Sequence, residues 1–114
     1  MLLSGPKVLV LGSVGNFTLD VAYLKSMLVN DVYFQEPGFW KEVNVLFKHE
    51  ASNQKLIINF NASDKTVASI SGKAQTGTWK IDSVVVMDYD NGEYVLGKAN
   101  IPNLDSYDIT VSAT

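Results

Sequence analysis

The chain has 114 residues, 46% of them hydrophobic and 18% charged, which suits one folded domain and excludes a disordered chain. All nine basic residues are lysines and the formal net charge is -3, so the arginine forks that read phosphates and guanine edges are missing and nucleic-acid binding is disfavoured. No cysteine is present, which removes disulfides, thiolate catalysis and cysteine-based metal sites.

Short apolar or alternating segments predict strands along the N-terminal part of the chain. Residues 7–11 read as a continuous apolar strand, and residues 12–16 as a loop. Residues 17–29 fit both a period of two and a helical stripe, and we interpret them as a strand because alternation matches more positions. A short strand over 32–36 is closed by the turn dipeptide at 37–38.

Alternation continues to the C-terminus. The further predicted strands cover residues 42–48, 55–61, 66–71, 78–87, 93–99 and 106–112. In the strand over 78–87, three consecutive valines indicate either burial on both faces or a β-bulge. The pair Asn91-Gly92 stands between two β-branched runs, which is a strong hairpin signal.

Seven to nine short strands with turns every 8–12 residues are typical of a β-sandwich or barrel. We therefore expect an all-β antiparallel β-sandwich that forms a single domain over residues 1–114. The apolar positions of the alternating strands predict the core: Val43, Val45, Phe47, Leu56, Ile58, Phe60, Trp79, Ile81, Val84, Val86 and Ile109.

One motif gives a resemblance. The stretch Gly77-Thr78-Trp79-Lys80-Ile81, followed by Asp88, Asp90, Asn91 and Gly92, resembles the C-terminal hairpin of bacterial immunoglobulin-like modules of cell-surface, secreted and phage structural proteins. The resemblance covers roughly residues 42–98. It implies an immunoglobulin-like sandwich with a structural or binding role rather than an activity.

Aromatic residues gather around Pro37-Gly38: Tyr33, Phe34, Phe39 and Trp40. Aromatics carried on a loop can stack on a sugar ring or on an apolar partner. Alternatively, Trp40 covers one open end of the sandwich core. These four residues are the candidate ligand-binding site.

The acidic turn offers Asp88, Asp90 and Glu93 as candidate Ca²⁺ ligands. The spacing departs from an EF-hand loop, and aspartates in hairpins also bond to backbone N–H groups. We therefore expect no cofactor, with Asn91 and Gly92 in the left-handed region. The one histidine, His49, is expected to be a solvated residue at a loop edge rather than a base or a metal ligand.

These features predict a protein that is not an enzyme. The expected function is a non-catalytic structural or adhesive module, excised from a larger surface, secreted or phage protein. The alternatives are a carbohydrate-binding module that uses the aromatics around Trp40 and a virion structural protein. The expected partners are neighbouring domains or a surface glycan or protein, and neither nucleic-acid binding nor membrane insertion is expected. The expected location is extracellular or at the cell surface, and the alternative location is the virion. The first residues make a poor signal peptide, so an export signal would lie outside this chain.

Overall fold

The computed structural model describes residues 2–27, 40–61, 67–71, 75–88 and 92–113. Within these ranges the chain is built mainly of strands. In chain order the elements are β1 (Leu3–Ser4), β2 (Val8–Val10), β3 (Val14–Leu19), α1 (Val21–Met27), β4 (Trp40–His49), β5 (Lys55–Phe60), β6 (Val67–Ser71), β7 (Gly77–Asp88), β8 (Glu93–Leu96), the 3-10 helix η2 (Leu104–Tyr107) and β9 (Ile109–Ser112). The all-β prediction is confirmed at this level.

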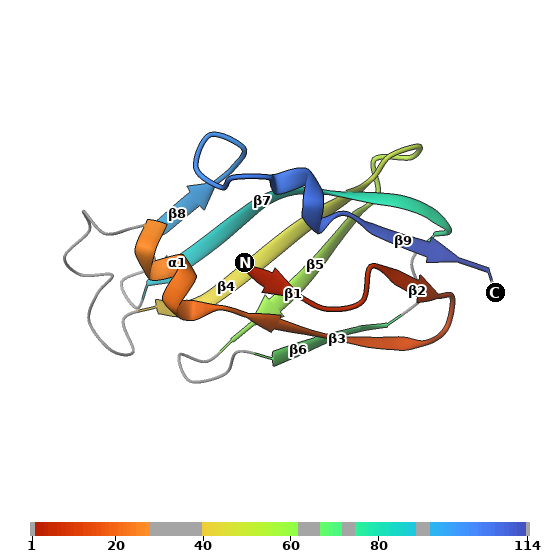
Figure 1. The fold of residues 1–114 in the computed structure, drawn as a ribbon, viewed down its shortest axis with the longest axis horizontal. Coiled ribbons are helices and arrows are strands. Elements are labelled where there is room, and N and C mark those ends of the chain that lie inside the picture. Colours follow the sequence, from red (N-terminus) through yellow and green to blue (C-terminus); the bar gives the residue numbers. More distant parts are fainter. Residues whose placement is uncertain (1, 28–39, 62–66, 72–74, 89–91, 114) are drawn as a thin grey trace.

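Two sheets contain these strands (Figure 1). The small sheet has the order β1-β3-β6, and the large sheet has the order β2-β9-β7-β4-β5, with β8 also paired to β7. The expectation of a wholly antiparallel sandwich is wrong at one pair, because β2 and β9 run parallel. Their ladder includes a hydrogen bond from Thr110 N–H to the Lys7 carbonyl at 2.8 Å and one from Leu11 N–H to the Ser112 carbonyl at 2.7 Å.

The N-terminal segment changes sheet between β1 and β2. β1 pairs with β3 in the small sheet, and after Gly5-Pro6 the chain joins β9 in the large sheet. The crossing passes directly over β3: a Cβ at Gly5 would clash with the ring of Phe17 and would lie 3.0 Å from the Asn16 carbonyl oxygen. Glycine is therefore required at position 5 by close approach rather than by its backbone angles.

A β-bulge in β7 explains the run of valines. Opposite β4, Leu46 pairs with Ser83 whereas Phe47 pairs with Ile81, so β7 has one extra residue at this point. The bulge inverts the alternation, and both Ile81 before it and Val84 after it are buried. The sequence left burial on both faces or a bulge open, and the register shows the bulge.

Two short strands share the other edge of β7. β8 pairs with residues 84–87 and β9 pairs with residues 77–79, while β4 pairs along the opposite edge. β8 and β9 therefore act as one strand that is interrupted by residues 97–108. The interruption contains η2, and Asp108 at its end accepts a 3.0 Å hydrogen bond from Ile81 N–H beside the bulge.

The core lies between the sheets. Every predicted core residue is buried except Leu56, which is partly buried and packs against the core. Leu2, Leu3, Phe17 and Leu19 add to the core from the side of the small sheet, and Leu9 adds to it from β2 of the large sheet. Burial of the facing sides of the two sheets is the main source of stability.

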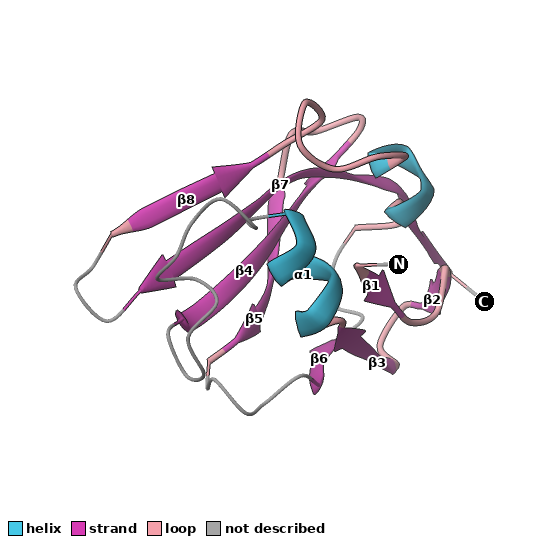
Figure 2. Ribbon diagram, turned by 60° about the vertical axis from the view of Figure 1, so that its left-hand side comes forward, coloured by secondary structure: helices cyan, strands magenta, loops and turns pink. Residues whose placement is uncertain are grey.

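The interpretation of residues 17–29 as one strand is wrong beyond Leu19, because residues 21–27 form α1. Asp20 begins this helix: its carboxylate accepts a 3.0 Å hydrogen bond from Tyr23 N–H, as an N-cap does. Leu24 is fully buried, and α1 lies on the side of the large sheet that also faces β1 (Figure 2). In the described part of the chain, no helix has the length and apolar character needed to cross a membrane.

Candidate functional site

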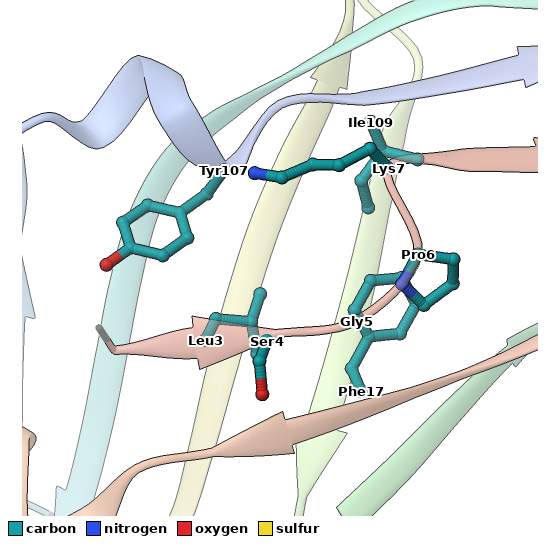
Figure 3. A pocket seen from close by; sticks show the side chains of 8 residues that line it. All are labelled: Leu3, Ser4, Gly5, Pro6, Lys7, Phe17, Tyr107 and Ile109. Atoms are coloured by element: carbon teal, nitrogen blue, oxygen red, sulfur yellow. The ribbon is translucent and has the colours of Figure 1, made fainter.

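A small cavity lies where the N-terminal segment crosses between the sheets (Figure 3). Its volume is about 130 Å³. The lining residues come from the crossing itself, from β3 and from the start of β9: Leu3, Ser4, Gly5, Pro6, Lys7, Phe17, Tyr107 and Ile109. The walls are mainly hydrocarbon, so the cavity suits a small apolar group.

The polar groups at the rim of this cavity bond to the protein itself. The Lys7 ammonium donates to the Ser106 carbonyl and lies 5.7 Å from the centre of the Tyr107 ring. The Tyr107 hydroxyl accepts a 2.8 Å hydrogen bond from Leu2 N–H. Ligand pockets usually enclose about 300–1,000 Å³, so this cavity, which Lys7 and Tyr107 line, is smaller than the usual ligand site.

A second hollow lies on the connection between β8 and β9. Its volume is about 570 Å³, and its lining residues all belong to that connection: Lys98, Ile101, Pro102, Asn103, Leu104, Asp105 and Ser106. Ile101 and Leu104 are buried beneath it. The hollow thus follows the shape of one loop, and none of the residues predicted from the sequence as a site lies in it.

At the acidic turn, the structure places Asp88 and Glu93 differently. Asp88 is 8% exposed, and its Oδ1 accepts a 2.7 Å hydrogen bond from Gly92 N–H, while Asp88 N–H donates to the Gly92 carbonyl at 3.0 Å. Glu93 is exposed on the neighbouring strand, and Asp90 lies outside the described residues. Asp88 thus closes the hairpin as a turn aspartate does, and the Ca²⁺ hypothesis stays a prediction.

Gly92 does not have the backbone conformation expected of it. Among the described glycines, those with positive φ are Gly12 and Gly77. What restricts Gly92 is space, because an added Cβ would lie 2.7 Å from Asp88 Oδ2. No group of three or more His, Cys, Asp or Glu residues that could hold a metal ion occurs in the described ranges.

The candidate aromatic site is largely beyond the described residues. Tyr33, Phe34 and Phe39 lie outside them. Trp40 begins β4 and pairs with Asp88 on β7, but its side chain is not among the described ones. Sugar binding by these residues therefore stays a prediction.

His49 is not solvated, so that expectation is wrong. It ends β4 with 6% of its surface exposed, and its ring lies 5.0 Å from the ring of Trp79. Nε2 is 2.8 Å from the Thr76 carbonyl oxygen, which can only accept, so Nε2 carries the hydrogen. Nδ1 accepts from Ser52 N–H at 3.2 Å. His49 is therefore a structural residue that ties two turns to the core.

The outer face of the large sheet, which points away from the small sheet, has a feature that the sequence analysis did not use. Ile57 on β5 is 56% exposed and Val95 on β8 is 62% exposed. Leu46 is directly opposite Ile57, and Val85 is directly opposite Val95. The signal was present in the sequence as apolar residues at outward positions of alternating strands, but only the register brings them onto one surface.

Comparison with known proteins adds no relative: no family model, no curated protein and no solved structure matches this chain. The strand order and the surfaces of the described residues are therefore the observations that bear on function.

Proposed function

We propose that this chain is a non-catalytic structural or adhesive module of a larger surface, secreted or phage protein, with an immunoglobulin-like fold. Such a module holds neighbouring domains in position and presents its sheet faces and loops on a rigid scaffold. Its function then depends on resistance to force and on surface contacts rather than on a reaction.

The strand order supports the immunoglobulin-like assignment. In immunoglobulin sandwiches one sheet contains strands A, B and E, and the other contains strands G, F, C and C′. Here the first, third and sixth strands form one sheet, and β9, β7, β4 and β5 follow one another in the other. The order of these strands along the chain also agrees with the order of strands A to G in an immunoglobulin sandwich, if β8 and β9 together are taken as strand G.

The parallel pair β2–β9 is the observation that carries the proposed role. β9 ends beside the C-terminus, and β2 follows β1 near the N-terminus (Figure 1), so once β1 has detached from β3, tension between neighbouring domains would pull β2 and β9 in opposite directions along their length. Their ladder bonds, including Thr110 N–H to the Lys7 carbonyl, are then loaded together in shear rather than one after another. A module that must transmit force benefits from this arrangement.

Single-molecule stretching tests this role. The chain is inserted between two handle domains and pulled from both ends, and we expect one cooperative unfolding event at high force. In the control, the same chain is pulled from its N-terminus and from a cysteine introduced as Asp105→Cys, which is possible because the chain has no cysteine of its own.

Asp105 is exposed and precedes β9. The control therefore applies both forces at the same end of the parallel ladder and peels the strands apart bond by bond. We expect a clearly lower unfolding force in the control geometry. Equal forces in the two geometries would contradict a load-bearing role for the terminal strands.

A further inference from the structure

An apolar strip crosses the outer face of the large sheet. Cross-strand pairing joins Ile57 to Leu46 and Val85 to Val95, and the two pairs are diagonal neighbours across β4 and β7, where Leu46 is opposite Ser83 and Val85 is opposite Asn44. The members of the strip are Leu46, Ile57, Val85, Met87 and Val95. Ile57 and Val95 are among the most exposed large hydrophobic residues of the described chain. Large apolar side chains gathered on an exposed sheet face are typical of an interaction surface.

Charged rows border the apolar strip at both ends. On one side Lys48 is directly opposite both Lys55 and Lys80. On the other side Glu42 and Glu93 flank Met87 from its two neighbouring strands. The two rows are six positions apart on β4, from Glu42 to Lys48, which corresponds to about 20 Å along the strand. The face is therefore basic at one end and acidic at the other.

In a single copy the basic row is unfavourable, because like charges directly opposite one another in a sheet repel, whereas the two glutamates of the acidic row are separated by the strand that carries Met87. Partners within the same chain offset only part of the unfavourable charge. Asp82 lies 3.6 Å from Lys48, and Glu42 accepts hydrogen bonds from the side-chain amides of Asn44 and Asn59 at 3.3 Å each. A face with an apolar centre and opposite charges at its two ends is complementary to the same face turned end for end.

We propose that the outer face of the large sheet binds a second copy of this chain, face to face, with the strands of the two copies running in opposite directions. The acidic row of each copy then lies over the basic row of the other, and the apolar strips meet between them. This arrangement is an isologous interface with two-fold symmetry, which closes as a dimer. The inference names a partner for the proposed module and rests on that function.

The size of the face sets the expected strength. Four strands about 4.8 Å apart and about 20 Å long present roughly 400 Å² per copy. Stable complexes usually bury about 800 Å² per partner. We therefore expect a weak, reversible dimer that forms at high local concentration, as between modules crowded on one surface.

Sedimentation velocity between about 5 and 500 µM tests the proposal across the range of weak affinities. We expect the average mass to rise toward that of a dimer, and high salt to oppose this rise because it screens the charged rows. Ile57→Asp and Val95→Asp should each weaken association about tenfold or more. Thr18→Asp is the control: Thr18 is a β-branched residue exposed on β3 of the small sheet, away from the proposed interface, and its replacement should leave association unchanged.

Charge reversal gives a sharper test. A variant with Glu42→Lys and Glu93→Lys has a basic face at both ends, and a variant with Lys55→Glu and Lys80→Glu has an acidic end in place of the basic one. Each alone should be monomeric, and an equimolar mixture should form a heterodimer, which a misfolded variant cannot do. Stretching experiments use one tethered copy, so their outcome is independent of this one.

Several results would overturn the proposal. Wild-type protein that remains monomeric at about 500 µM would leave the face to another kind of partner or to solvent. Undiminished association of Ile57→Asp would place the contact elsewhere on the molecule. Absence of heterodimer in the mixture of charge variants would show that the charged rows do not pair across an interface between copies.

Discussion

Asp108 holds the distorted part of β7 through a single hydrogen bond. Ile81 is buried next to the bulge, and its N–H finds its acceptor in Asp108 Oδ1 at 3.0 Å. Replacing Asp108 with alanine leaves that buried donor without this partner, which costs about 1–3 kcal/mol. We expect the urea midpoint of Asp108→Ala to fall while the slope of the transition stays the same.

Asp108→Asn is the control for this prediction. The asparagine side chain keeps a carbonyl oxygen at the same place, so it should retain most of the lost stability. If both variants lose the same stability, the charge of Asp108 rather than its acceptor oxygen is what matters at this position. If neither variant is destabilised, Ile81 N–H has another adequate partner.

His49 illustrates what cannot be read from sequence at the scale of single residues. Its place after an alternating strand and before a polar turn suggested a solvated side chain. Its burial depends on the Thr76 carbonyl and on the ring of Trp79, which are some thirty residues away in sequence. Trp79 itself was predicted correctly, because its burial follows from the alternation of its own strand.

At the scale of elements, local pattern predicted the central strands well, but it placed residues 14–16 of β3 in a loop and residues 106–107 of η2 in a strand. β4 and β5 alternate cleanly, with one face in the core, and their positions agree with the predicted ones to within two residues. α1 was missed because seven residues give too short a stripe for periodicity to decide. A better signal was Asp20 directly before the stripe, which is a preferred N-cap residue.

The cap of α1 leads to a prediction for this element. Asp20 accepts from Tyr23 N–H at 3.0 Å, and Leu24 in the helix is fully buried. Asp20→Ala should destabilise the protein by about 0.5–2 kcal/mol, whereas Asp20→Ser should lose less, because serine also caps. Thermal unfolding followed by circular dichroism measures both. Equal stability of Asp20→Ala and wild type would show that the helix does not depend on its cap.

At the scale of the whole molecule, the topology is what the sequence could not supply. The pattern of residues 7–11 predicted a strand but not its parallel pairing with a strand one hundred residues later. Likewise, β1 has two residues, too few for any periodicity, and its place in the small sheet depends on the turn at Gly5-Pro6. The candidate interaction face is a property of the same register, since outward apolar residues become a surface only when their strands are neighbours.

The N-terminal segment should therefore be essential to the whole fold. Leu2, Leu3 and Leu9 are all buried, and removal of residues 2–11 also leaves the edges of β3 and β9 without their partners. Loss of a buried leucine side chain costs about 2–5 kcal/mol, so three approach the 5–15 kcal/mol that typically stabilises a domain. We expect the truncated chain to lack a cooperative urea transition and to aggregate through its open edges.

Removal of residues 113–114 is the control and should leave the transition unchanged, because Ala113 is exposed. A truncated chain that still unfolds cooperatively, at a similar midpoint, would show that the fold is complete without β1 and β2.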